Sequence, residues 1–131
     1  MIDTNYFREY FTDNPVNYIL KSYREATETD EFLSSVDRFA FRTKNDIPVS
    51  QLKTLYSEIR PLETADLNRL KMLRINLAFI AGKNDKSQAT QKLCALLDAL
   101  LQNVNEDSMD SFKDFFEALL AYYKLHNPKA K

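Results

Sequence analysis

Glycine is almost missing from this chain, since one glycine and four prolines are spread over 131 residues. A sheet of many strands needs glycine-rich turns and bulges, whereas the Leu, Ala, Lys, Glu and Gln of this chain favour helices. Three of the prolines and Gly82 fall where helices are expected to begin or end. The sequence therefore predicts an all-α fold.

Apolar residues at helical spacing predict a compact bundle of five to six helices. We expect a single domain over residues 1–131, with frayed ends at 1–13 and 127–131. The first expected helix begins at Asn14 and Pro15 and fades at 27–29, the second covers 30–42, and the third runs from Pro48 to Pro61. The fourth covers 64–81, with Gly82 as a left-handed stop. The fifth is capped by Ser87, and the last is capped by Asp107 or Ser108.

The expected helix over 64–81 is apolar on two opposed sides. At about 100° per residue, one side carries four large aliphatic residues and the other carries three large apolar residues; the first set is Leu70, Leu73, Leu77 and Ile80, and the second is Met72, Ile75 and Phe79. A surface helix needs only one apolar side. This helix is therefore either the central helix of the bundle or one that offers a face to another subunit, and self-association as a dimer or filament is possible.

Two cationic strips separate these apolar sides, one with Arg69 and Lys83 and the other with Lys71 and Arg74. The net charge of the whole chain is −1, which argues against a free-standing nucleic-acid binder. Residues 65–104 nevertheless contain six basic and three acidic residues. A solvated surface is the ordinary role of such charges, but apolar faces beside cations also suit a subunit stacked along a nucleic acid.

No familiar catalytic or metal-binding arrangement is visible in the sequence. His126 lies near the end of the last helix, where a cation stabilises the helix dipole, and Cys94 lies on an apolar helical face as a small buried residue. One cysteine and one histidine cannot complete a zinc site. We expect no enzymatic activity, cofactor or metal, and, without an export signal or a membrane-spanning run, a cytoplasmic protein.

Most tyrosines and phenylalanines have core spacing, which favours packing over stacking on bases. Tyr122 and Tyr123 are the candidates for stacking, because adjacent residues on a helix cannot both face the same core.

Three segments resemble the small helical subunit of type III-A CRISPR (Csm) complexes. They are Pro-Val-Ser-Gln-Leu-Lys-Thr-Leu-Tyr at 48–56, Leu-Arg-Ile-Asn-Leu-Ala-Phe-Ile-Ala-Gly-Lys at 73–83, and the run from Phe112 through Glu117-Ala-Leu-Leu-Ala-Tyr-Tyr-Lys124. Their order and spacing, over about 31–127, carry the resemblance.

The resemblance implies a non-catalytic subunit, present in several copies beside the backbone subunits that hold the CRISPR RNA. Its implied partners are the other Csm subunits, the CRISPR RNA and the target RNA. By position, Lys53, Arg74, Lys83 and Lys124 match basic sites of the family. With the remaining cations of the two strips, the candidate RNA-binding residues are Lys53, Arg69, Lys71, Arg74, Lys83 and Lys124.

The chain also departs from the family pattern. Thr54 and Asn76 stand at basic positions, Ile75 replaces a proline, and Tyr123 replaces a histidine. Residues 1–30 have no counterpart, and this acidic extension is a candidate docking element for a neighbouring subunit.

Three alternatives stay open at this point. The first is the small subunit of a type III-B (Cmr) complex, and the second is a helical adaptor without a nucleic-acid role. The third is a helix-turn-helix regulator, against which the two apolar sides of the helix over 64–81 argue.

Overall fold

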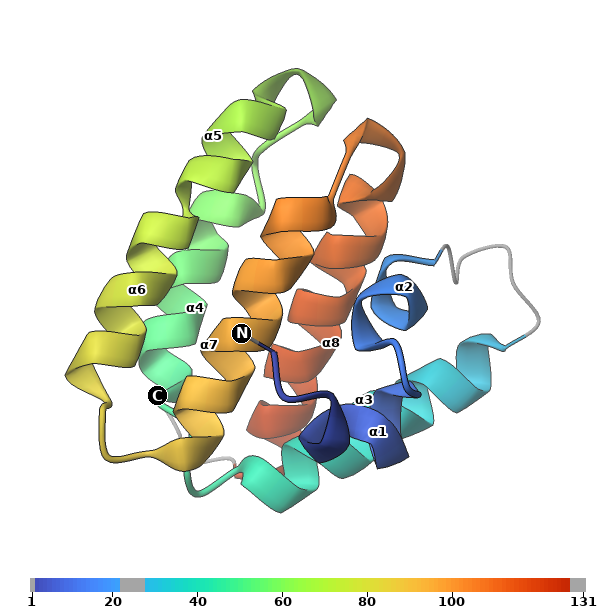
Figure 1. The fold of residues 1–131 in the computed structure, drawn as a ribbon, viewed down its shortest axis with the longest axis vertical. Coiled ribbons are helices and arrows are strands. Elements are labelled where there is room, and N and C mark those ends of the chain that lie inside the picture. The colour runs from blue at the N-terminus through green and yellow to red at the C-terminus, as the bar shows by residue number, and fades with distance from the viewer. Residues whose placement is uncertain (1, 22–27, 128–131) are drawn as a thin grey trace.

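The computed structural model describes residues 2–21 and 28–127 of the chain. All regular structure within these two ranges is helical. In chain order the helices are α1 (Thr4–Phe11), α2 (Pro15–Leu20), α3 (Thr29–Thr43), α4 (Val49–Ile59), α5 (Leu67–Met72), α6 (Arg74–Lys83), α7 (Gln88–Asn103) and α8 (Met109–His126), with 3₁₀ turns at Thr64–Asp66 and Glu106–Ser108. The expected all-α bundle is confirmed (Figure 1).

The six expected helices correspond to α2, α3, α4, the pair α5 and α6, α7, and α8. Their start signals act as predicted at two places. The side chain of Asn14 accepts a hydrogen bond from the Asn17 backbone N–H, with Pro15 in the first turn, and the Ser87 hydroxyl accepts one from the Thr90 backbone N–H. The last helix differs slightly, because Asn105 caps a 3₁₀ turn that leads into α8.

The start of the chain differs from the expectation of a frayed segment over 1–13, because residues 4–11 form α1. Asp3 caps this helix by accepting a hydrogen bond from the Tyr6 backbone N–H at 3.1 Å. Phe7 and Phe11 are fully buried, and their rings lie 5.5 and 5.6 Å from that of Phe39 on α3. Burying a phenylalanine side chain stabilises a fold by about 1.5–3 kcal/mol, which holds this short helix in place.

Other end signals were less accurate. Helix α2 ends at Leu20, so the expected fading over 27–29 falls partly outside the described residues, and Thr29 already begins α3. The expected fraying at 127–131 also lies outside them beyond Asn127, whose backbone N–H still bonds the Tyr123 carbonyl at 2.9 Å.

Gly82 is not the left-handed stop that the sequence predicts. It lies inside α6, and its φ is not positive. The helix ends one residue later because Asn84 and Gln91 supply donors to its last carbonyls. The Asn84 amide donates to the Ile80 carbonyl at 2.7 Å, and the Gln91 amide donates to the Ala81 carbonyl at 2.7 Å.

The expected helix over 64–81 is interrupted at Leu73, where the backbone N–H bonds the Leu70 carbonyl three residues back at 3.0 Å. Figure 1 shows α5 and α6 as one bent rod at the left edge of the bundle. Leu70 and Leu77 on its inner side are buried. The outer side is exposed, so this rod is not the central helix and offers a face to its surroundings.

The core joins α8 to the helices around it. Helix α3 crosses the bottom of the view in Figure 1 and contacts α8, and α4 and α2 also contact α8. Leucines from α7 and phenylalanines from α8 fill the centre, among them Leu97, Leu100, Phe112 and Phe116, all fully buried. No helix in the described part of the chain has the length and apolarity to cross a membrane.

Candidate nucleic-acid interface

An open groove lies between the outer sides of α4 and α8, with a volume of about 970 Å³. Its walls combine apolar and cationic side chains. The lining residues are Val49, Lys53, Tyr56, Ser57, Arg60, Pro61, Glu117, Leu120, Ala121 and Lys124. Two of the six predicted RNA-binding residues, Lys53 and Lys124, thus meet in one groove although 70 residues separate them in the chain.

Helical spacing explains this convergence. Lys53, Ser57 and Arg60 recur at intervals of four and three residues, which places them on one side of α4. Glu117 and Lys124 recur at an interval of seven on α8, so they also share one side. Each helix therefore supplies one wall of the groove.

The two walls are held together at Tyr56. Its ring stacks on Phe116 with centroids 5.2 Å apart, and its hydroxyl donates to Glu117 Oε1 at 3.1 Å. Burial and this hydrogen bond raise the pKa of Tyr56, so the phenol stays protonated at neutral pH. The floor of the groove is therefore fixed by an aromatic pair and a neutral donor.

The charge balance of the groove is positive. Lys53, Arg60 and Lys124 are exposed. Among the described residues that line the groove, Glu117 is the single carboxylate, and it already accepts the bond from Tyr56. Lys113 donates to the carbonyls of Arg60 and Leu62. This lysine thus bonds the carbonyl of Arg60, the residue that caps α4, and that of Leu62 just beyond the helix.

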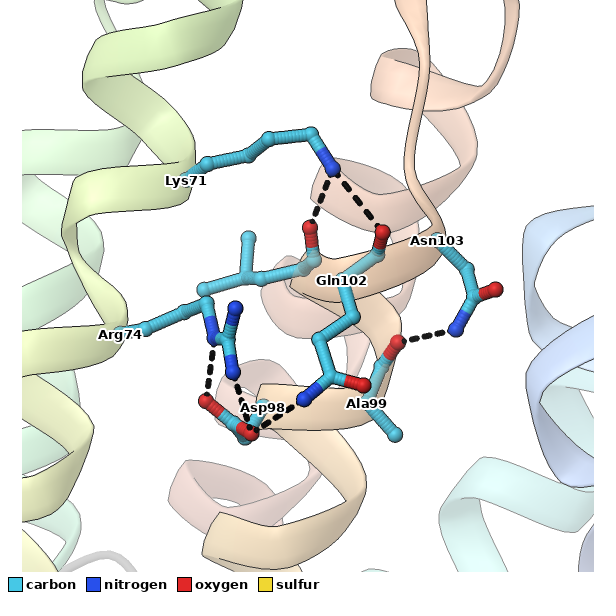
Figure 2. A network of polar contacts seen from close by, with 7 residues as sticks. Lys71, Arg74, Asp98, Ala99, Gln102 and Asn103 are labelled. Carbon is cyan, nitrogen blue, oxygen red and sulfur yellow. Dashed lines mark hydrogen bonds and ion pairs between the residues drawn. The ribbon is translucent and has the colours of Figure 1, made fainter.

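Lys71 and Arg74 serve a different purpose, as Figure 2 shows. The Lys71 ammonium donates to the carbonyls of Leu101 and Gln102 at 2.9 and 3.0 Å. Arg74 forms a two-pronged ion pair with Asp98, with Nε and a terminal nitrogen 2.7 and 3.2 Å from the carboxylate oxygens. Both cations therefore bind α5 and α6 to α7, and Lys71 caps the C-terminal carbonyls of α7.

The remaining two predicted cations lie apart from the groove. Arg69 is exposed on α5, with Asp66 at 3.7 Å. Lys83 is exposed at the end of α6 and lines a smaller groove between α4 and α6, together with Asn76 and Phe79. The structure thus brings together two of the six predicted residues, Lys53 and Lys124, in the large groove.

Tyr123 is not available for stacking on a base. It is fully buried, and its hydroxyl hydrogen-bonds the Thr43 hydroxyl at 2.6 Å. Its neighbour Tyr122 is half-buried at a separate groove between α3 and α8. The prediction that these adjacent residues face different surroundings is correct, but Tyr123 faces the core.

Cys94 and His126 have structural surroundings. Burial raises the pKa of the Cys94 thiol to about 11, as the sequence reading of a buried residue implies. His126 Nε2 contacts the Asp37 carboxylate, and its ring packs edge-on against Phe41 with centroids 5.1 Å apart. The side chain of His126 thus joins the end of α8 to α3 through its contacts with Asp37 and Phe41.

Arg60 is the groove residue that the sequence analysis missed. It stands next to Pro61, where the expected helix ends, and it matches none of the family's basic positions quoted above. A usable signal was present, because Arg60 follows Lys53 by seven residues and therefore shares its side of the helix.

Comparisons with known proteins agree with the resemblance found in the sequence. The Csm2 Type III-A family model matches residues 26–129, which is most of the chain. No curated protein and no solved structure matched the chain. The family match covers the groove helices α4 and α8 and both cationic strips. The chain therefore belongs to the Csm2 Type III-A family, the small subunit of the type III-A Csm complex.

Proposed function

We propose that this small subunit is non-catalytic and contacts the duplex of guide and target RNA through the groove between α4 and α8. The observation that carries the proposal is the meeting of Lys53, Arg60 and Lys124 on the two walls of one groove. Three cations against one engaged carboxylate create a positive surface that suits the phosphates of a nucleic acid.

Recognition through this groove is independent of base sequence. Lysine and arginine side chains neutralise phosphates, and phosphate contacts position a nucleic acid without reading its bases. Base pairing between guide and target therefore selects the target, and the small subunit holds the resulting duplex.

The modest charge of one groove suits a subunit that acts in several copies. Two or three phosphate contacts give weak, salt-sensitive binding, whereas copies fixed side by side on one strand act at a high effective concentration. The isolated chain, with a net charge of −1, is accordingly expected to bind RNA weakly.

Lys83 and Arg69 are secondary candidates for RNA contact, because both are exposed and outside the groove. Lys71 and Arg74 are weaker candidates, since their donors are directed at α7. A phosphate would have to compete with two backbone carbonyls or with a carboxylate for these side chains.

The experiment that tests the function is purification of the tagged full-length chain from its own host at low salt, followed by sequencing of bound RNA and mass spectrometry of bound proteins. We expect short repeat-derived guide RNA together with the other Csm subunits. A Lys53→Glu and Lys124→Glu double variant tests the groove itself. If its complex, assembled with the Csm subunits and guide RNA, recovers as much target RNA as the wild-type complex, the role of the groove is refuted. Recovery of the chain alone, free of RNA, would leave a helical adaptor as the better account.

A further inference from the structure

One carboxylate lies among the cations of the groove between α4 and α8. Glu117 is exposed on α8 and lines the groove together with Lys53, Arg60 and Lys124. Charges of like sign repel, so Glu117 lowers the attraction of this groove for phosphates. A groove that only attracts phosphates gains nothing from this side chain, whereas a groove that also reads a hydrogen-bond donor on the nucleic acid does.

The fold uses only part of the acceptor capacity of Glu117. The Tyr56 hydroxyl donates to Oε1 at 3.1 Å, and an ionised carboxylate has about four acceptor positions. In the part of the chain that the structure describes, Glu117 forms no ion pair with the three groove cations. Lys113, one turn earlier on α8, is directed at two backbone carbonyls near the end of α4. The carboxylate can therefore accept a further hydrogen bond from outside the chain.

Tyr56 holds this carboxylate in a defined place. The tyrosine is buried, and its ring stacks on the fully buried Phe116 with centroids 5.2 Å apart. Because burial and the bond to Glu117 raise the pKa of Tyr56, its hydroxyl is a donor throughout the neutral range. An acceptor that is fixed before the ligand arrives loses little entropy on binding.

Glu117 also lies at the point where two grooves meet. Glu117 and Ala121 line the groove between α4 and α8 and also the smaller groove between α3 and α8, which Ala118 lines as well. These three residues share one side of α8 and form a low crest between the grooves. The short alanine side chains let a ligand come close to Glu117. An A-form duplex has a wide, shallow minor groove, which such a crest can approach.

The donors of a nucleic acid are few. Phosphate oxygens only accept hydrogen bonds, so the donors are the amino and imino groups of the bases and the 2′-hydroxyl of ribose. The base donors change with the sequence, whereas the 2′-hydroxyl recurs at every nucleotide of RNA and displays itself in the minor groove. For a subunit that binds without regard to sequence, the 2′-hydroxyl is the donor present at every register, and DNA lacks it.

From these observations we infer that Glu117 accepts a hydrogen bond from a ribose 2′-hydroxyl and makes the groove selective for RNA over DNA. Lys53, Arg60 and Lys124 attract any phosphate backbone, and Glu117 opposes a backbone that has no hydroxyl to donate. Tyr56 is the positioning residue, because it holds the carboxylate. The inference rests on the proposed function of the groove and adds the group that distinguishes the two kinds of nucleic acid.

Sugar-modified targets test the inference in the assembled Csm complex with its own guide RNA. Filter retention at one stated salt concentration gives the affinity for a ribose target and for the same target with 2′-fluoro sugars. The fluorine keeps the A-form shape of the duplex but has no proton to donate. The ratio of the two affinities is the ribose preference, and contacts made by the other subunits affect the wild-type and variant complexes equally.

Glu117→Ala should lower the ribose preference at least about fivefold, since a hydrogen bond to a charged acceptor is lost. Glu117→Gln keeps a carbonyl acceptor and should retain most of the preference. Glu106→Ala, at an exposed glutamate outside the groove, is the matched control and should leave the preference unchanged. The measurements are repeated with a second guide and target of unrelated sequence.

Three results would overturn the inference. Glu117→Ala could strengthen binding of both targets by the same factor, which would make the carboxylate merely repulsive. It could leave the ribose preference unchanged. The effect could also follow the base sequence rather than the sugar, which would make a base the donor.

Tyr56→Phe supplies a second test, because it keeps the carboxylate and the stacked ring. We expect a loss of ribose preference smaller than that of Glu117→Ala, and an unchanged preference would contradict positioning by Tyr56. Failure of this inference is distinguishable from failure of the groove. If Lys53→Glu with Lys124→Glu loses target affinity while Glu117→Ala keeps the ribose preference, only the inference falls. If the lysine variant binds the target normally, the proposed function of the groove falls too.

Discussion

Lys53 on α4 and Lys71 on α5 look alike in the sequence but lie in different surroundings. Lys53 lines an open groove that faces solvent, with Arg60 and Lys124 beside it. Lys71 reaches the end of α7 and donates to two of its backbone carbonyls. The same side chain is thus a free charge in one region and a structural clamp in the other.

The two lysines differ because Lys71 lies near backbone carbonyls at the end of α7 that have no partner within that helix. The end of α7 leaves carbonyls without intrahelical partners, and a lysine at the right height satisfies them. The corresponding carbonyls at the end of α4 are satisfied by Lys113 from α8. The side chains of Arg60 and Lys53 line the groove instead.

The reactivity of Cys94 gives the largest expected effect. This residue lines a groove between α6 and α7 together with Arg74 and Asp98, so its reactivity reports on the packing of α6 on α7. With the pKa of the thiol raised to about 11, the thiolate at pH 8 is about a hundredfold scarcer than for an ordinary cysteine. Exchange of the Cys94 thiol with a disulfide reagent should be slow at pH 8 and accelerate as the pH approaches 11. Reaction rates measured with a chromogenic disulfide in the native and denatured chain check this; equal rates would contradict it.

Charge reversal in the groove should give the next largest effect. Lys53→Glu combined with Lys124→Glu should weaken binding of target RNA by the assembled complex at least about tenfold, since two attractive phosphate contacts become repulsive. Binding is measured by filter retention at a fixed, stated salt concentration. Lys86→Glu, a single charge reversal at an exposed lysine outside the groove, is compared with Lys53→Glu alone and should change affinity less than about twofold.

Removal of the Lys71 contact with α7 should lower stability and leave RNA binding unchanged, which is the opposite of the result expected for the groove lysines. Lys71→Met leaves two carbonyls at the end of α7 without their charged donor and should lower the free energy of unfolding by about 1 kcal/mol, while RNA affinity stays nearly constant. Urea denaturation of the isolated chain measures the first quantity. Lys83→Met, at an exposed lysine, should have a much smaller effect on stability; equal effects of the two substitutions would show that the clamp is unimportant.

Tyr56→Phe should produce the smallest change. It removes the hydrogen bond to Glu117 but keeps the stacking on Phe116, so we expect a loss of about 0.5 kcal/mol of stability. The freed carboxylate of Glu117 would then be available to nearby cations and should slightly weaken RNA binding. A gain in RNA affinity would contradict the idea that the freed Glu117 carboxylate weakens RNA binding by neutralising the groove cations.

The helices were predictable where local signals act within one turn. Asn14 and Ser87 cap their helices as their side chains suggest. The interruption at Leu73 has no proline or glycine to announce it, and Gly82 stays helical because Asn84 and Gln91 satisfy the carbonyls around it. Helix α1 was missed because its stability comes from burying Phe7 and Phe11 against distant residues.

The candidate site was predictable only in part, for a similar reason. The resemblance drew attention to Lys53 and Lys124, which the fold then brings together. It could not separate them from Lys71 and Arg74, because the acceptors of those cations lie 24 to 31 residues further along the chain. Only the packing of α5 and α6 on α7 shows which cations are already engaged.

Cross-linking of the assembled complex to target RNA that carries 4-thiouridine is the most direct test of the central claim. Irradiation followed by peptide sequencing locates each RNA adduct on this chain. The account predicts adducts on peptides from α4 and α8 that contain Lys53, Arg60 or Lys124. Adducts confined to residues 67–83, or a complex that links RNA to its other subunits but never to this chain, would contradict it.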